Sequence, residues 1–576
     1  MCGIAGFNFK DKELIKKMVQ KLNHRGPDSK GFYLDKVSLG HSRLSIIDIN
    51  NGKQPMYNED GSIVIVFNGE IYNYKELKKE LEKKHRFSTE SDTEVIIHGY
   101  EEWGIDVLKK LNGQFAFCLY DGKKMFLARD RLGIKPLYFY AKDNKFIFAS
   151  EMKAILEYPI NKEVDKSVIS DYFSYNYVPA PKTILKNVYK LLPGHYLLFQ
   201  DLKIKIRPYW DVEFVKKDVS LNQIYQKLKE SVEKRLIADV PVGAFLSGGI
   251  DSSLIVALIS QLKKEVKTFS VGFTNGNNEL DIAKKTSEKF NTDHHEYMVD
   301  TSDFSLFKKL VYCADEPFAD TSLIPSYFVC KMARQKVKVC LSGDGGDENF
   351  AGYQRYVKNK TEKYYSKIPI FNERFKRIRE ISKIKNNLTR FIKGNETFID
   401  SEKKELLFVP INKSYKMKYN KFKDLNGLLY NDIKTTLPNS YLKKVDTASM
   451  TNSLEVRTPF LDHEFVEMCA TISPNQKLFN LQKKFLLKKI AKPILPKEVL
   501  KAKKTGFSSP VDSWLRNELK DTLHKTIMNS SKRGILNKNY INKLWKQHQK
   551  KEFNHQQKLW NIICLEMWYE KFIDND

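Results

Sequence analysis

The chain has 576 residues, of which 41% are hydrophobic, 12% are aromatic and 29% are charged. This composition excludes a mainly disordered chain, and no apolar stretch approaches the roughly 20 residues that a membrane-spanning helix needs. The formal net charge is +28, and residues 351–576 contribute most of it, with 46 basic and 23 acidic side chains. A lysine-rich solvated surface is the simpler interpretation of this charge, and a nucleic-acid-binding surface is the alternative.

The seven cysteines are scattered along the chain without a C-x-x-C pair. This spacing predicts neither a disulfide framework nor a zinc site, and it is typical of a protein of the reducing cytoplasm. The first residues lack the basic and then apolar pattern of a secretion signal, which again favours the cytoplasm.

The first 210 residues are predicted to form strands with tight turns and short helices, which indicates an α+β layered domain over 1–210. Short apolar runs predict the strands, one of which ends at Asn68-Gly69 and two of which form a hairpin. The strands are expected at 62–67, 114–120 and 125–128, and amphipathic helices at 75–84 and 93–104.

Beyond residue 210 the pattern changes to alternating helices and buried strands. This alternation predicts a parallel α/β sheet in a second domain over 215–576, with a helical and basic part from 351 onward. The strands are expected at 242–246, 267–273 and 336–341, and the helices at 223–237, 252–262 and 282–290.

Cys2 is the first candidate catalytic residue. If Met1 is removed, Cys2 carries a thiol and a free α-amine, and an amine with a pKa near 8 can act as the general base for its own nucleophile. Such a site needs no separate histidine or aspartate.

Five motifs accompany Cys2, in the order Met1-Cys2-Gly3-Ile4-Ala5-Gly6, His24-Arg25-Gly26-Pro27-Asp28, His41-Ser42-Arg43-Leu44-Ser45-Ile46-Ile47-Asp48, Asn68-Gly69-Glu70-Ile71-Tyr72-Asn73 and Ser91-Asp92-Thr93-Glu94. In order and spacing they resemble the class II glutamine amidotransferases. The resemblance implies a layered αββα amidohydrolase domain in which Cys2 attacks the amide of glutamine.

The resemblance also assigns roles around that amide. Asn68 and the Gly69 N–H are expected to stabilise the tetrahedral oxyanion, which needs donors already in place. Arg43 is the expected partner of the glutamine carboxylate, and Glu70 and Asp92 are the expected partners of its α-ammonium. The complete expected glutamine site is Arg43, Leu44, Ser45, Ile46, Ile47, Asn68, Gly69, Glu70 and Asp92.

Two glycine-rich turns follow predicted strands of the second domain. The turn Ser247-Gly248-Gly249-Ile250-Asp251-Ser252 leads into a helix, so its backbone N–H groups and the helix N-terminus favour an anion. The turn Ser342-Gly343-Asp344-Gly345-Gly346-Asp347-Glu348 holds three carboxylates, which repel one another unless a metal or another cation is present. Both turns lie where an open parallel sheet places its ligand crevice.

The first turn resembles the pyrophosphate loop of enzymes that cleave ATP between its α and β phosphates. With the later runs Tyr441–Asp446, Ser453–Asp462, Lys484–Lys488 and Gly506–Pro510, nearly the whole chain resembles the family of glutamine-hydrolysing asparagine synthetases. The resemblance implies that ammonia from glutamine crosses an internal tunnel to an ATP-pyrophosphatase domain. There aspartate becomes β-aspartyl-AMP, pyrophosphate leaves, and ammonia then displaces AMP to give asparagine.

By the same resemblance Asp344 lies by the adenylate and Lys484 stabilises charge that develops on the phosphates, so both are expected to be catalytic. ATP and Mg²⁺ are the expected cofactors, with Asp251 and Asp347 as the metal ligands. The expected nucleotide-binding residues are Leu246, Ser247, Gly248, Gly249, Asp251, Ser252, Val271, Ser342 and Gly343. The oligomeric state is left open between a monomer and a homodimer.

Three departures from the family pattern lie in the second domain: Asn349, Thr447 and the run Lys501-Ala502-Lys503-Lys504. They leave the acceptor open between aspartate and another carboxylate, such as a sugar acid used in surface polysaccharide synthesis. Two alternatives of other classes are an RNA-binding enzyme that uses the basic C-terminal part, and a catalytically inactive interaction or storage protein. The presence of Cys2, Arg43, Asn68 and Asp251 together argues against the latter.

Overall fold

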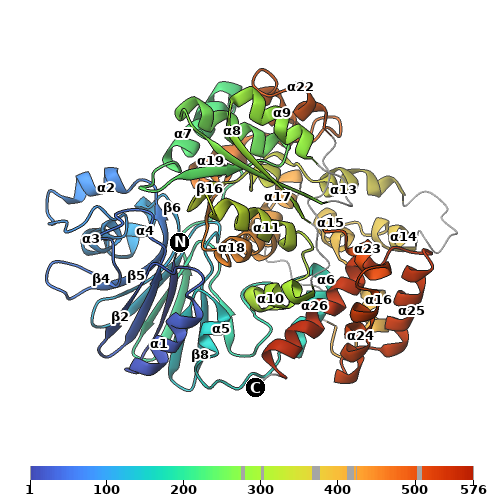
Figure 1. The fold of residues 1–576 in the computed structure, drawn as a ribbon, viewed down its shortest axis with the longest axis horizontal. Helices are drawn as coiled ribbons and strands as arrows, with labels where there is room; N and C mark the ends of the chain where they lie inside the picture. Colours follow the sequence, from blue (N-terminus) through green and yellow to red (C-terminus); the bar gives the residue numbers. More distant parts are fainter. Residues whose placement is uncertain are drawn as a thin grey trace.

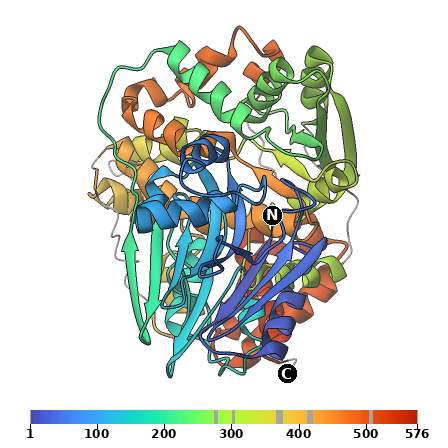
Figure 2. The ribbon, with the colours of Figure 1, turned by 90° about the vertical axis from the view of Figure 1, so that its left-hand side faces the viewer.

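Three β-sheets organise the chain in the computed structural model, which describes residues 2–273, 279–299, 304–365, 376–411, 421–422, 424–502 and 509–574. Two antiparallel sheets built from the first 208 residues lie face to face (Figure 1, lower left). A parallel sheet with helices lies above them, and a helical C-terminal part lies to one side. The N-terminus is at the centre of the molecule, where these parts meet (Figures 1 and 2).

The first sheet has the strand order β10-β8-β9-β1-β3-β2, and the second has the order β12-β11-β7-β6-β5-β4. The first consists of β1 (Gly3–Phe7), β2 (Ser29–Leu34), β3 (Ser38–Arg43), β8 (Tyr138–Lys142), β9 (Lys145–Ala149) and β10 (Val188–Lys190). The second consists of β4 (Met56–Tyr57), β5 (Val64–Ile71), β6 (Gly113–Tyr120), β7 (Met125–Arg129), β11 (His195–Gln200) and β12 (Lys203–Pro208).

Helices cover the outer faces of both sheets, so the first part is an αββα sandwich as expected. Between the sheets, side chains such as Ile4 and Leu39 pack against Val66. The apolar side of α1 covers the first sheet, and the apolar sides of α2 and α3 cover the second. The helices of this part are α1 (Lys12–Lys21), α2 (Tyr74–Leu81), α3 (Glu94–Trp103), α4 (Val107–Lys110), α5 (Met152–Ile155) and α6 (Ile169–Tyr175).

The predicted elements of this part are confirmed, with one correction. Strands β6 and β7 form the expected antiparallel hairpin, and α2 and α3 lie where helices were predicted. The prediction that the strand at 62–67 ends at Asn68-Gly69 is wrong. Both residues continue β5, opposite Ala116 and Phe115 of β6.

The parallel sheet has the order β15-β14-β13-β16-β17 and carries helices on both faces, which confirms the predicted α/β architecture. Its strands are β13 (Val242–Phe245), β14 (Lys267–Phe273), β15 (Asp293–Val299), β16 (Val339–Leu341) and β17 (Glu455–Arg457). The helices of this region are α7 (Leu221–Lys234), α8 (Ile250–Leu262), α9 (Leu280–Phe290), α10 (Phe304–Ala314), α11 (Leu323–Arg334) and α12 (Gly346–Phe350).

The described residues after 351 form helices and their connections as predicted, and they also include the strand β17, which the sequence did not reveal. β17 has three residues, which are too few to show the alternation of apolar and polar side chains that predicts a strand. It joins the sheet by pairing in parallel with β16. The helices are α13 (Gln354–Tyr365), α14 (Lys376–Ser382), α15 (Asn387–Asn395), α16 (Asp400–Leu406), α17 (Leu425–Lys434), α18 (Leu442–Met450), α19 (His463–Thr471), α20 (Pro474–Lys477), α21 (Phe485–Ala491), α22 (Lys497–Lys501), α23 (Val511–Arg516), α24 (Lys520–Ser530), α25 (Lys538–Gln549) and α26 (Gln556–Phe572). A π-helical turn, Leu437–Tyr441, leads into α18.

None of the helices described is long and apolar enough to cross a membrane. All seven cysteines are free thiols in this structure.

The last long helix, α26, joins the C-terminal part to the rest of the molecule. It packs along α10 and α24 (Figure 1). Trp568 is completely buried, and its indole N–H donates to the carbonyl of Asp315, 2.7 Å away. Tyr172 of α6 likewise donates to the carbonyl of Asn561, so α26 also contacts the first part of the chain.

We expect Trp568→Ala to lower the free energy of unfolding by about 3–5 kcal/mol, because it removes a buried indole and leaves a cavity. The measurement is the chemical denaturation midpoint of the full chain. Phe408→Ala is the matched control, since Phe408 is 67% exposed and its loss is expected to change stability by no more than about 0.5 kcal/mol. Equal midpoints for the two variants would contradict the central role of α26.

Candidate active sites

Cys2 lies directly before β1, in the seam between the two antiparallel sheets and the parallel sheet. Its side chain is 7% exposed, and burial raises the pKa of its thiol. The backbone nitrogen of Cys2 donates to Asn68 Oδ1, 3.0 Å away. Asn68 Nδ2 is buried and has no acceptor among the described residues, so it is an available donor, although Asn68 is not among the residues that line the cavity beside Cys2.

The glycine after Asn68 is required by a neighbouring strand. A Cβ on Gly69 would lie 2.2 Å from the carbonyl oxygen of Gln114 in β6, so no larger residue fits there. The close pairing of β5 with β6 therefore fixes the backbone at the position where an oxyanion donor is predicted.

A small cavity beside Cys2 brings together most of the predicted glutamine-binding residues. Arg43 lines it and donates to the carbonyls of Ile47, Asp48 and Ile49, so its guanidinium also holds that loop. Ser45 does not line the cavity, and its amide donates to Asp28 instead. The predicted residues that do line the cavity are Cys2, Arg43, Leu44, Ile46, Ile47, Gly69, Glu70 and Asp92.

Five further lining residues were missed from the sequence: Gly52, Gln54, Phe67, Ser91 and Thr93. Ser91 and Thr93 flank Asp92 in one of the motifs, and this adjacency was a usable signal. Gln54 gave no signal, because its role depends on the fold. Its side chain accepts from the Phe67 amide, 2.7 Å away, and donates to the hydroxyl of Thr93.

The cavity ends in a buried acidic cluster. Burial, together with Glu455, raises the pKa of Asp92 to about 7, and the same causes raise the pKa of Glu70. Arg457, which lies on β17, acts in the opposite direction and lowers the pKa of both Asp92 and Glu70. Its Nη2 lies 3.2 Å from Glu70, and its Nε lies 2.5 Å from Glu455. An incoming ammonium group would offset the remaining negative charge, as the predicted contact with glutamine requires.

Arg25 connects this site to the second half of the chain. It is completely buried, and its Nε donates to the carbonyl of Cys2, 3.0 Å away. Its other nitrogens bind Glu151 at 2.7 Å and both carboxylate oxygens of Asp446 in α18 at 2.8 and 3.0 Å. Charge-assisted bidentate pairs of this kind fix geometry strongly.

The second site lies at the carboxyl ends of β13 and β16, as predicted. After β13, the Ser247 amide and hydroxyl bond to Ser252 Oγ, which also donates to the Gly249 carbonyl, so the loop is closed onto the start of α8. A Cβ on Gly343 would lie 2.8 Å from the Ser252 nitrogen, which shows how closely the two glycine-rich turns approach. Ser342 donates to Asp344, 2.6 Å away.

Lys484 and two carboxylates form the charged centre of this pocket. Lys484 Nζ pairs with Asp251 and with Asp347, the latter at 2.8 Å. Cβ atoms on Gly346 and Gly352 would collide with these carboxylates, so glycines make the room that they occupy. Two hard oxygen ligands beside a phosphate-binding turn suit Mg²⁺, which proteins bind through one or two carboxylates together with substrate phosphates. The donor set therefore fits the expected ion.

All predicted nucleotide-site residues line this pocket of about 690 Å³, which is within the range of small-molecule sites. Glu348 was counted from the sequence among the three carboxylates of the second turn but was given no role of its own; it lines the pocket, and burial raises its pKa to about 7. The residues brought together are Leu246, Ser247, Gly248, Gly249, Asp251, Ser252, Val271, Ser342, Gly343, Asp344, Asp347 and Lys484.

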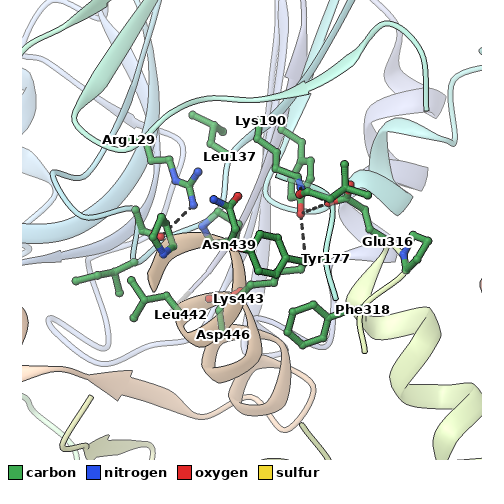
Figure 3. A pocket seen from close by; sticks show the side chains of 17 residues that line it. Arg129, Leu137, Tyr177, Lys190, Glu316, Phe318, Asn439, Leu442, Lys443 and Asp446 are labelled. Atoms are coloured by element: carbon green, nitrogen blue, oxygen red, sulfur yellow. Dashed lines mark hydrogen bonds and ion pairs between the residues drawn. The ribbon is translucent and has the colours of Figure 1, made fainter. Parts of the chain in front are cut away.

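A smaller cavity of about 30 Å³ lies between the two halves, large enough for a water-sized molecule (Figure 3). Lys190 and Glu316 face each other across it at 2.7 Å, and Asp446 also lines it. The stretch formed by the π-helical turn and α18 separates it from the nucleotide pocket. Lys443 points to the small cavity, whereas Lys444 lines the nucleotide pocket.

Two of the departures from the family pattern lie away from the nucleotide pocket. Asn349 is buried and donates to the Phe460 carbonyl at 2.7 Å, and neither it nor Thr447 is among the lining residues. Lys503 and Lys504 of the third departure, and residues 506–508 of the last motif, lie outside the described residues.

Comparisons with known proteins agree with this geometry. Residues 223–570 match the family model of asparagine synthase, and residues 1–210 match that of a glutamine amidotransferase domain. The chain belongs to the asparagine synthase family. It is 36% identical to asparagine synthetase [glutamine-hydrolyzing] 1 of Bacillus subtilis, over 99% of this chain and 96% of the relative.

Two further relatives of this chain carry different names. A putative asparagine synthetase 2 of Methanocaldococcus jannaschii is 37% identical over 78% of this chain and 98% of its own length. The amidase chry2 of Gibberella zeae is 28% identical over 89% of this chain and 90% of its own. Membership in the asparagine synthase family makes this chain a carbon–nitrogen ligase that binds ATP and takes nitrogen from glutamine.

We expect the KM for glutamine to rise as the pH falls through about 7, because protonation of Asp92 removes a carboxylate that pairs with the substrate ammonium. The measurement is the pH profile of glutaminase kcat/KM between pH 5.5 and 8.5. Asp92→Asn is expected to raise KM about 10- to 100-fold and to remove this acid limb. Asp121→Asn, in the turn between β6 and β7, is the control. An unchanged acid limb in Asp92→Asn would contradict the assignment.

Proposed function

We propose that this chain makes asparagine from aspartate, ATP and glutamine. Residues 1–210 form the glutaminase domain, and residues 215–576 form the ATP-pyrophosphatase domain. The observation that carries the proposal is the pairing of Lys484 with Asp251 and Asp347 beside two glycine-rich turns, in a chain that also holds Cys2 against Asn68. The names of the Bacillus subtilis and Methanocaldococcus jannaschii relatives support aspartate as the acceptor.

In the first site, removal of Met1 gives Cys2 a free α-amine, which takes the thiol proton. The thiolate attacks the glutamine amide carbon, and the oxyanion accepts hydrogen bonds from Asn68 Nδ2 and the Gly69 N–H. The amine returns the proton to the leaving nitrogen, so ammonia departs and a thioester forms. Water then hydrolyses the thioester to glutamate and restores the thiol.

In the second site, the β-carboxylate of aspartate attacks the α-phosphorus of ATP and pyrophosphate leaves. Lys484 stabilises the charge on the departing phosphates, and the glycine-rich turn after β13 binds them through backbone N–H groups. Ammonia then attacks the acyl carbon and AMP leaves. A bound Mg²⁺ supplies charge neutralisation of the phosphates, with Asp251 and Asp347 as its protein ligands.

Aspartate as the acceptor needs cations beside its carboxylates and a carboxylate beside its ammonium group. Lys444 and Lys488 line the pocket, and so do the carboxylates of Asp344 and Glu348. This combination suits an amino acid with a second carboxylate. A sugar acid lacks the ammonium group that Asp344 and Glu348 would bind.

Ammonia released at Cys2 must pass the stretch from Leu437 to Met450 to reach the pocket. The small cavity next to Asp446 is the candidate stopping point on that path. It shares no lining residue with the nucleotide pocket, and side chains of the π-helical turn and α18 line one or the other.

The test of the acceptor is pyrophosphate release by the purified chain with ATP, Mg²⁺ and glutamine, with and without aspartate. We expect aspartate to stimulate pyrophosphate release, with asparagine formed in equal amount. Glucuronate and galacturonate are the comparison acceptors. Glutamine hydrolysis without aspartate-dependent pyrophosphate would reject aspartate while keeping the first site, and stimulation by a uronate would identify the other class of acceptor.

We expect Cys2→Ala to abolish glutamine-dependent synthesis and to keep synthesis with added ammonium chloride, because the thiol serves the first site alone. The measurement is asparagine formed with each nitrogen source. Cys313→Ala is the control and is expected to retain both activities. Asp251→Asn is the opposite case and is expected to lose pyrophosphate release while it still hydrolyses glutamine. If Cys2→Ala, correctly folded, also lost ammonia-dependent synthesis, the division into two sites would be wrong.

A further inference from the structure

Two histidines and two glutamates converge on the outer side of the αββα sandwich, away from both pockets. They are Glu59 in the turn after β4, His85 after α2, and His98 and Glu101 on successive turns of α3. One ligand atom from each lies within 4.8 Å of the others. Three separate segments of chain therefore present metal-binding atoms to one point.

The separations between these atoms match a tetrahedral ion. A metal with bonds of about 2.0–2.1 Å to nitrogen and oxygen requires ligand–ligand distances of roughly 3.3–3.4 Å. His98 Nδ1 lies 2.9 Å from Glu101 Oε2 and 3.6 Å from Glu59 Oε2. His85 Nδ1 lies 3.5 Å from the other Glu59 oxygen, Oε1, and 3.6 Å from Glu101 Oε2. These four distances lie within about 0.5 Å of the tetrahedral value, and the Glu59 carboxylate would turn one oxygen toward both rings to hold a single ion.

A carboxylate lies behind each imidazole. His85 Nε2 is within hydrogen-bond distance of Glu102, 3.1 Å away, and this carboxylate–histidine arrangement orients a metal-binding imidazole and makes it a better ligand. His98 Nε2 is 3.6 Å from Glu94, an ion-pair separation without a hydrogen bond. The Glu101 carboxylate is oriented in turn by Asn58 Nδ2, 2.8 Å away.

The two imidazole rings lie side by side, stacked with centroids 4.8 Å apart. Carboxylate oxygens lie within 4 Å of both nitrogens of each ring. A divalent ion between the two Nδ1 atoms and the inner carboxylates would offset the negative charge of Glu59 and Glu101.

We propose that Glu59, His85, His98 and Glu101 bind one zinc ion in a structural site. Two nitrogens and two oxygens that converge on one point suit zinc, which takes four ligands in structural sites, and four protein ligands leave no position for catalysis. The cysteine spacing gave no sign of such a site, because none of its ligands is a cysteine.

The ion would brace the segment that carries Asp92. His85 and His98 flank that segment in the chain, and within it the Ser88 and Thr89 amides already donate to Glu94 at 2.6 and 2.8 Å. Closing the segment with a metal removes freedom from it in the unfolded chain and fixes the start of α3. The site itself does not depend on the identity of the acceptor.

The test is titration of the chelator-treated full chain with zinc chloride, in buffer with millimolar Mg²⁺ to occupy the acidic nucleotide pocket. We expect one equivalent to bind and to raise the melting temperature. Co²⁺ in place of zinc is expected to give the intense visible absorption of a tetrahedral nitrogen–oxygen site, without the near-ultraviolet band of a thiolate.

Variants locate the ion. His85→Gln and Glu101→Gln are expected to weaken zinc binding at least 100-fold, and Glu102→Gln, behind His85, about 10- to 100-fold. Glu82→Gln and His524→Gln, outside the cluster, are the controls and are expected to bind as the parent does. Absence of stoichiometric binding, an octahedral Co²⁺ spectrum, or unchanged affinity in His85→Gln and Glu101→Gln would each overturn the proposal and leave an ion-pair cluster.

Discussion

The buried contact of Arg25 with Asp446 joins the two halves of the chain at the nucleophile. The guanidinium holds the backbone of Cys2 on one side and a carboxylate of α18 on the other. Removing one member of a buried pair costs about 3–5 kcal/mol, because the other charge is left without compensation. Arg25 therefore positions the nucleophile Cys2, and Asp446 of the second domain in turn holds Arg25 in place.

Buried charges are also held by opposite charges in the nucleotide pocket, within a single group of side chains. Asp251 and Asp347 lie close enough to share Lys484, and this is possible because glycines at 346 and 352 leave their Cβ positions empty. The two negative carboxylates stay close together because Lys484 pairs with both and because Gly346 and Gly352 leave room for them. A phosphate ligand with its metal would enter a site whose charges are already arranged, which reduces reorganisation during the reaction.

The sequence predicted what depends on local pattern. Cys2 with its motifs, the two glycine-rich turns and most strands were readable, because each is a short run with its own period or turn chemistry. Arg25 and Asp446 are 421 residues apart, so their pairing is a tertiary fact that no local pattern carries. β17 is too short to show a period, and Asn68 continued a strand where Asn-Gly suggests a turn, because pairing with β6 outweighed the local preference. Gln54 and the cluster around His98 were missed for the same reason: their neighbours come from separate segments.

Arg457 contacts both halves of the molecule. Its side chain reaches Glu70 at the glutamine cavity, while its carbonyl accepts a hydrogen bond from Ser342 at the start of a nucleotide turn, 2.9 Å away. One residue thus belongs to both sites. Arg25 of the first half pairs with Asp446 of the second, and Arg457 of the second half pairs with Glu70 of the first. Exchange of one half therefore preserves both sites only when the incoming half supplies the matching member of each pair.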